Sequence, residues 1–153
     1  MAKNTIKVKN YSDIMEEITA TAVAIRPGVF LELTSAGTVQ AVSTAGGNII
    51  PMVACEDELQ GKGIGDSYAA SDKIQVWIPG RGDQVYAWLE DGQSVAIGAF
   101  LECTTTGTLQ AHAADISDAP NVTNQIVAVA LEAVDLTASA NLTADGRIIV
   151  RIV

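Results

Sequence analysis

The side chains that could carry out acid and base chemistry in this chain are few and far apart. One histidine, His112, occurs among 153 residues, and no serine or cysteine lies in a nucleophile motif such as G-x-S-x-G. General acid and base catalysis needs positioned groups with tuned pKa values. Because His112 directly follows an expected strand, we interpret it as a strand-end or loop residue and predict no catalytic site.

Glutamates recur at matching places in two similar parts of the chain, where the pairs are Glu32 with Glu102 and Glu56 with Glu132. Two acids can divide the acid and base roles of an enzyme. A duplicated glutamate beside an apolar strand face is more simply a solvent-side or interface position. The acidic run 56–58 matches no calcium loop, and nothing resembles H-E-x-x-H. We therefore predict neither a metal site nor a cofactor.

Three further motifs have structural interpretations. The glycine-rich run from Gly61 to Gly65 lacks the Walker spacing and a β-α context, so we expect a flexible loop. The tripeptide Arg81-Gly82-Asp83, which some adhesive proteins use, predicts a tight turn with an unusual glycine conformation and an aspartate cap. Cys55 and Cys103 lack C-x-x-C spacing and stand where the similar part of the chain has leucine. We expect two reduced, buried thiols.

Charge is distributed unevenly along the chain. The formal net charge is −9 and the sequence pI about 4.3. Residues 1–10 carry three lysines and no acid, whereas the remainder carries six basic and eighteen acidic residues, a net of −12. An acidic surface repels phosphate backbones and anionic lipid, and the apolar runs are far shorter than the roughly 20 residues that cross a membrane. We expect no nucleic-acid or membrane partner, and no secretory signal peptide is recognised.

A phrase of fourteen residues occurs twice, as GVFLELTSAGTVQA at 28–41 and GAFLECTTTGTLQA at 98–111, with nine identical positions. The similarity extends to Val23-Ala24-Ile25 with Val95-Ala96-Ile97, and to Val53-Ala54-Cys55-Glu56 with Val129-Ala130-Leu131-Glu132. An internal repeat of this kind indicates a duplicated structural unit. We expect two repeats, at about 20–82 and 83–153, within one body spanning 18–153.

Alternation of period two predicts strands inside each repeat. Val29, Leu31 and Leu33 lie on one face of the first strand and Phe30, Glu32 and Thr34 on the other. The glycines of the following turns can take the positive φ of a hairpin. Further turn signals about every ten residues favour a sandwich or barrel. We predict an all-β fold in which duplicated β-hairpin units form a small β-sandwich or barrel, similar to a β-tulip, with one shared core.

Residues 1–17 are expected to form an extended N-terminal arm, ordered on binding. They hold few large apolar side chains, and at Asp13 to Glu17 we expect one helical turn at most. A segment of this composition is expected to stay mobile until a partner binds it. The candidate binding residues of the arm are Lys3, Ile6, Lys7, Val8, Lys9 and Tyr11.

Two aromatic residues near the middle of the chain, Tyr86 and Trp88, form the candidate interface. If they project from the outer face of their strand, they would anchor a protein contact or stack on a sugar. The sequence leaves open whether they lie in the core instead. Trp88 with Asp91 and Gln93 is the candidate carbohydrate site.

The combination V-A-I, G-x-F-L-E, T-x-x-G-T-x-Q-A and V-A-x-E, with a closing strand after a D-G turn, covers about residues 20–153. It resembles the capsid decoration or cement proteins of tailed bacteriophages. The resemblance implies a non-enzymatic virion protein on the outer capsid surface, made in the cytoplasm of the host bacterium. It implies a trimer at threefold positions that clamps neighbouring major capsid proteins and stabilises the expanded shell.

Two other classes of function are considered. A carbohydrate- or receptor-binding β-module of a phage tail or cell surface would need exposed aromatics flanked by polar residues. A small hydrolase would need a nucleophile and a base, and neither can be named in this sequence.

Overall fold

The computed structural model describes residues 4–11, 13–21, 24–113, 124–137 and 146–153. Within these residues the protein is all-β, as predicted, and one 3-10 turn at Glu58–Gln60 is the only helical element. The strands are β1 (Lys7–Lys9), β2 (Met15–Thr19), β3 (Leu31–Leu33), β4 (Val39–Ala41), β5 (Val53–Ala54), β6 (Lys73–Trp77), β7 (Gln84–Trp88), β8 (Ser94–Val95), β9 (Phe100–Cys103), β10 (Leu109–Ala111), β11 (Ala128–Ala130), β12 (Val134–Asp135) and β13 (Arg147–Ile152).

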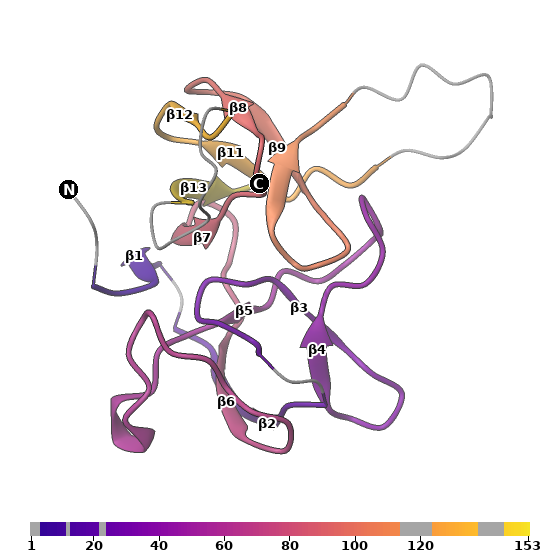
Figure 1. Ribbon diagram of the computed structural model, residues 1–153, viewed down its shortest axis with the longest axis vertical. Coiled ribbons are helices and arrows are strands. Elements are labelled where there is room, and N and C mark those ends of the chain that lie inside the picture. Colours follow the sequence, from indigo (N-terminus) through magenta and orange to yellow (C-terminus); the bar gives the residue numbers. More distant parts are fainter. Residues whose placement is uncertain (1–3, 12, 22–23, 114–123, 138–145) are drawn as a thin grey trace.

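These strands form small antiparallel sheets and no closed barrel. The largest sheet has six strands in the order β1-β7-β13-β11-β9-β10. The others are β2-β6-β5, the hairpin β3-β4 and the pair β8-β12. In Figure 1, β2 to β6 lie in one half of the molecule and β7 to β13 in the other.

The two halves share one arrangement of five strands, to which the second half adds the pair β8-β12. Strand β2 pairs with β6 as β7 pairs with β13, and β5 pairs with β6 as β11 pairs with β13. The hairpins β3-β4 and β9-β10 complete the correspondence, with Glu32 opposite Gln40 and Glu102 opposite Gln110. We call β2 to β6 the first unit and β7 to β13 the second unit. The duplicated hairpin that the sequence predicted is confirmed.

One part of the sequence alignment between the repeats was wrong. It matched Ile25 with Ile97, whereas the structure matches Ile25 with Val95. The amide of Val29 donates to the carbonyl of Arg26 (3.1 Å), and three residues before the equivalent Ala99 the carbonyl of Ala96 accepts in the same way (3.1 Å). Both Ile25 and Val95 are buried. The buried side chain must keep its spacing from this turn, so the match shifts by two residues.

The first unit begins earlier than the sequence indicated. Residues 15–17, assigned above to the arm, form β2 together with residues 18 and 19, and no helical turn is present there. Strand β2 pairs with β6 along its whole length, from Met15 opposite Trp77 to Thr19 opposite Lys73. The backbone groups of this segment are satisfied by the neighbouring strand, which is why the segment is extended rather than helical.

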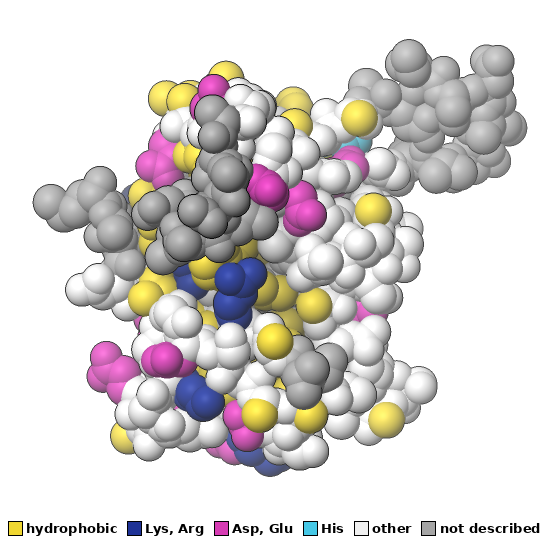
Figure 2. Space-filling view, in the orientation of Figure 1, with side chains coloured by type: hydrophobic (Ala, Val, Ile, Leu, Met, Phe, Trp, Pro, Cys, Tyr) yellow, Lys and Arg dark blue, Asp and Glu magenta, His cyan; other side chains and the backbone are white. Residues whose placement is uncertain are grey.

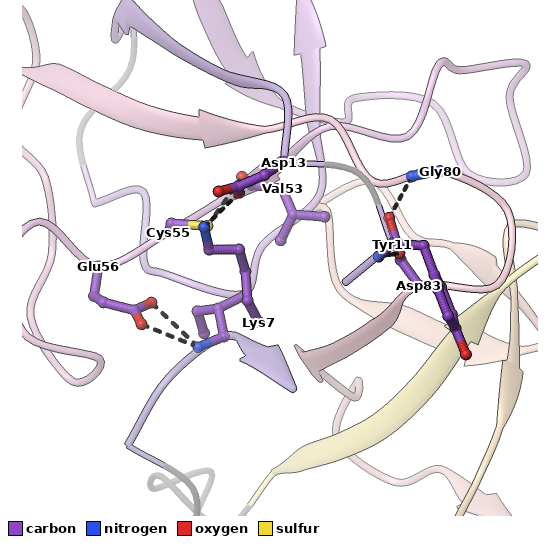
Figure 3. A network of polar contacts seen from close by, with 9 residues as sticks. Lys7, Tyr11, Asp13, Val53, Cys55, Glu56, Gly80 and Asp83 are labelled. Carbon is purple, nitrogen blue, oxygen red and sulfur yellow. Dashed lines mark hydrogen bonds and ion pairs between the residues drawn. The ribbon is translucent and has the colours of Figure 1, made fainter. Parts of the chain in front are cut away.

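The described residues that precede β2 are built into the fold and do not form a free arm. Strand β1 pairs with the edge of β7, and the side chain of Ile6 is fully buried in the larger core. The amide of Tyr86 donates to the carbonyl of Ile6 (2.8 Å), and the Ile6 amide donates to the Glu56 carboxylate (3.2 and 3.3 Å; Figure 3). The expectation of an arm ordered only on binding was therefore wrong. Strand β1 satisfies backbone groups that an open edge of β7 would leave unpaired.

The core joins the two units. The larger apolar cluster contains side chains from the second unit together with Phe30, Val53 and Trp77 of the first unit and Ile6. A smaller cluster lies within the first unit and is closed by Trp88 of the second. Each unit thus buries apolar side chains of the other, which is what two half-units with uncovered faces were expected to do.

Candidate interaction surfaces

The histidine and the first pair of repeated glutamates form structural hydrogen bonds. Glu102 is 2% exposed, and its carboxylate accepts from Gln110 Nε2 (2.8 Å) and Asn124 Nδ2 (3.1 Å). His112 Nδ1 lies 2.7 Å from the other carboxylate oxygen. In the first unit Gln40 donates to Glu32 in the same cross-strand arrangement (2.7 Å). The repeated glutamate and glutamine therefore fasten each hairpin across its two strands.

The other carboxylates singled out in the sequence bind backbone amides. Glu132 accepts from the Ile149 amide (2.7 Å), as Glu56 accepts from that of Ile6. Asp57 caps the 3-10 turn by accepting from the amides of Leu59 and Gln60. Among the described residues, no three His, Cys, Asp or Glu side chains lie close enough together to hold a metal ion.

The Arg81-Gly82-Asp83 tripeptide is a tight turn, as predicted. Gly82 has a φ of +96°, and Asp83 accepts from the Gly80 amide (2.7 Å). The Asp83 carboxylate also accepts from the amide of Tyr11, so it ties Tyr11 to the turn that precedes β7 (Figure 3). Asp83 is fully buried. Its carboxylate is engaged inside the protein and does not reach the surface, where an adhesion receptor would need it.

Trp88 and Tyr86 are core residues, so the candidate interface built on them was wrong. They are 5% and 9% exposed. Strand β7 lies between β1 and β13, which leaves neither edge of it open. The guanidinium groups of Arg26 and Arg147 each lie 4.1 Å from the centroid of the Trp88 ring. Its Nε1 donates to the carbonyl of Pro27 (2.9 Å).

Arg147 joins this aromatic cluster to the glycine-rich loop. Its Nη2 donates to the carbonyl of Ile64 (2.6 Å) and its Nη1 to that of Tyr86 (3.4 Å). Burial lowers the pKa of Arg147 to about 10. The loop at 61–65 is therefore held to the body at Ile64.

On the face shown in Figure 2, Lys and Arg side chains gather near the middle of the molecule, with acidic side chains above and below them.

A cavity of about 330 Å³ lies where the two units meet. It is lined by Arg26, Val29 and Ala41 of the first unit and by Trp88, Glu90 and Thr108 of the second, among others. The hydroxyl groups of three threonines in the β9-β10 turn, Thr104, Thr106 and Thr108, donate to the Glu90 carboxylate. Glu90 therefore secures the turn of the second hairpin beside the first unit.

The cysteines are buried and unpaired with each other, as the sequence predicted. Cys55 is 2% and Cys103 1% exposed. Burial is the principal cause that raises the pKa of each thiol to about 12. Both side chains belong to the larger core. They serve as small apolar residues there and stay protonated at neutral pH.

The N-terminal segment, defined as the described residues among 4–14, presents an exposed surface. Tyr11 is 69% and Ile14 53% exposed. Lys9 lies over the Tyr11 ring, with Nζ 5.0 Å from the centroid, and Lys7 pairs with Asp13 (2.7 Å). Of the other candidate arm residues, Val8 is half-buried, Ile6 is in the core and Lys3 lies outside the described residues.

Several exposed apolar side chains escaped the sequence reasoning. They are Ile14, Leu33, Ile50, Leu59, Ile97 and Phe100. Residue type alone does not indicate that Leu33 and Phe100 are exposed, because the residue at the same position in the other repeat, Cys103 or Phe30, is buried. Only the arrangement of the two units shows which copy is exposed.

No family model matches the chain, and no curated protein matches it. Among the described residues, no helix has the length and apolar character needed to span a membrane.

Proposed function

We propose that this protein is a structural component of a bacteriophage virion that binds the outer surface of the mature capsid. It acts as a trimer at threefold positions and stabilises the expanded shell by clamping neighbouring major capsid proteins. The observation that carries the proposal is a basic N-terminal segment that presents exposed Tyr11 and Ile14 on an acidic β-body.

The N-terminal segment is suited to binding because its backbone is already fixed. The Tyr11 amide donates to Asp83, and the carbonyl of Ile14 accepts from the Ile78 amide (2.9 Å). A side chain held on an ordered backbone loses less conformational freedom on binding than one on a mobile tail. Tyrosine is also among the residue types that contribute most to protein interfaces. Tyr11 and Ile14 therefore form the proposed capsid-binding surface.

The charge distribution supports binding of the N-terminal segment to the outer face of the shell. The chain after residue 10 has a net charge of −12, so it is repelled by packaged DNA and is compatible with the outer face of the shell. The lysines of residues 1–10 would face an acidic or polar patch of the capsid protein. Three linked contacts in a trimer raise the effective affinity without a strong single contact. A protein that binds only the mature shell stabilises that shell by mass action.

The carbohydrate-binding alternative required an exposed Trp88, and this residue is not exposed in the structure. Trp88 is buried and in contact with Arg26 and Arg147, and the side chain of Gln93 accepts from the Ala111 amide (3.0 Å). A sugar needs an exposed ring to stack on. We therefore do not propose this alternative.

Co-sedimentation with capsids tests the proposal. The full chain is mixed with mature capsids and with unexpanded procapsids of the phage that encodes it. We expect saturable binding to mature shells and weak binding to procapsids. Absence of binding to both shells would overturn the proposal.

Single substitutions test the proposed surface. Deletion of residues 1–17 is unsuitable because it would remove Ile6 from the core and most of β2. Tyr11→Ser and Ile14→Ser change exposed side chains instead, and each is expected to weaken capsid binding at least tenfold, as about 1.4 kcal/mol would. Leu59→Ser is the control, since Leu59 is 99% exposed on the 3-10 turn. Equal binding by all four proteins would place the contact elsewhere.

A further inference from the structure

The two units place the same sequence phrase in different environments. Phe30 is fully buried, whereas its counterpart Phe100 is 54% exposed. On the hairpins the difference is reversed, because Leu33 is 58% exposed and its counterpart Cys103 only 1%. We call Phe30, which directly precedes β3, and Phe100, at the start of β9, the strand ends of the two units. In the first unit the strand end is covered and the β3-β4 hairpin is exposed. In the second unit the β9-β10 hairpin is covered and the strand end is exposed.

This asymmetry arises from one contact inside the chain. The β9-β10 turn packs on the strand end of the first unit, and the Phe30 amide donates to the carbonyl of Gly107 (2.8 Å). The fit is close, because a Cβ added at Gly107 would lie 2.3 Å from the Phe30 carbonyl oxygen and 2.6 Å from Val29. A Cβ added at Gly37, in the turn of the other hairpin, would meet nothing within 4 Å.

A second part of the same contact covers the side of the β9-β10 hairpin. The Gly46 amide donates to the carbonyl of Cys103 (2.8 Å), and Gln125 exchanges hydrogen bonds with the backbone of Ile49 (2.5 and 3.0 Å). In the first unit the corresponding side of the β3-β4 hairpin is uncovered. A cavity of about 280 Å³ lies there, lined by Leu33, Ile50 and their neighbours.

The contact between the units is therefore head-to-tail. If a twofold axis related the units, each hairpin would cover the other unit's strand end. Here one hairpin and one strand end are used, and their counterparts at Leu33 and Phe100 are left exposed. The unused elements carry the same key residues as the used ones, with Gly37 equivalent to Gly107 and Phe100 to Phe30.

We propose that the unused hairpin of one copy docks on the unused strand end of a second copy, repeating the contact found inside the chain. The β3-β4 turn would approach Ala99 and Phe100 of the second copy. Leu33 and Ile50 would cover the Phe100 ring, so that exposed apolar surfaces on both copies leave water. The occupant is a second copy because its β3-β4 hairpin matches nine of fourteen residues of the phrase that already makes this contact.

A head-to-tail contact of this kind forms a closed ring when its rotation closes. A ring of three copies would contain six equivalent units, which gives the trimer of the proposed function a specific interface. The inference does not require capsid binding, because the contact forms between free copies. Failure of self-association would leave binding to mature shells open to its own test.

Sedimentation velocity on the free protein, across a dilution series up to the highest soluble concentration, tests the inference. The wild-type chain is expected to form a closed species of at least three copies of 15.9 kDa. Leu33→Asp and Phe100→Asp each disable one side of the contact and are expected to be monomeric. Both positions are exposed, so circular dichroism should show an unchanged fold. Leu59→Asp is the control and should assemble like the wild type.

Mixing the two variants distinguishes a head-to-tail contact from a symmetric one. Phe100→Asp retains the intact hairpin, and Leu33→Asp retains the intact strand end. An equimolar mixture is expected to form a dimer with one copy of each and nothing larger. A monomeric wild type, a wild type that stops at a dimer, unaffected single variants, or a mixture that stays monomeric would each overturn the inference.

Discussion

Phe30 and Phe100 occupy the same position in the two units, but the side chain of Phe30 is fully buried and that of Phe100 is 54% exposed. The difference comes from the β9-β10 hairpin, which packs on the first unit only. Equivalent substitutions in the two units should therefore have unequal effects, and each such pair provides its own control.

The first prediction concerns this pair. Phe30→Ala removes a ring from the larger core and should lower the free energy of unfolding by about 3–5 kcal/mol. Phe100→Ala removes an exposed ring and should change it by less than about 0.5 kcal/mol when measured on the dissociated chain. Urea unfolding at low protein concentration measures both. Similar losses at the two positions would contradict the described packing.

The second prediction concerns the hairpin turns. Gly37 and Gly107 have φ values of +74° and +72°, so alanine at either position incurs a similar cost, about 1 kcal/mol. Gly107→Ala also places a Cβ against the backbone of Phe30, whereas Gly37→Ala meets open space. Thermal unfolding should show a clearly larger loss for Gly107→Ala. Equal losses would mean that the second hairpin does not pack on the first unit.

The third prediction concerns Asp83, which holds the N-terminal segment. Asp83→Ala leaves the amides of Tyr11 and Gly80 without their acceptor and should cost about 1–3 kcal/mol. It should also speed hydrogen exchange in β1. Arg81→Ala alters the exposed residue of the same turn and should leave both quantities near wild type. Unchanged exchange in β1 after loss of Asp83 would show that the segment is held by other contacts.

The fourth prediction concerns the thiols. The pKa of Cys55 and of Cys103 is raised from 9.0 to about 12, chiefly by burial. At pH 8 the folded protein should resist alkylation, and both residues should react once denaturant is added. The unfolded chain releases these protons first, so the stability they contribute is complete below pH 9 and is lost as the pH rises toward 12. Rapid alkylation of the native protein would contradict burial of the thiols.

The sequence was sufficient to predict the hairpins because their phrase is conspicuous. The paired turns around Gly37 and Gly107 and the period-two strands beside them predict the same structure twice. The buried cysteines and the turn at Asp83 also follow from local patterns. These features depend on neighbouring residues in the chain, which is where sequence patterns are most informative.

Strand β2 and the N-terminal segment could not be predicted in the same way. Strand β2 is equivalent to β7, yet MEEIT and QVYAW share no residue. Its pairing with β6, more than fifty residues away, is a tertiary effect that overrides local preference. The burial of Ile6 likewise depends on the pairing of β1 with the edge of β7. For Phe30 and Phe100 the residues are identical, and only the head-to-tail order of the units decides which is buried.

Shell stability is the measurement that tests the proposed function most directly. Mature capsids are heated with and without saturating protein, and their disruption is followed by light scattering or release of DNA. The proposal predicts a higher disruption temperature with the wild-type protein and a smaller increase with Tyr11→Ser. An unchanged disruption temperature for shells that carry the bound protein would contradict a stabilising role.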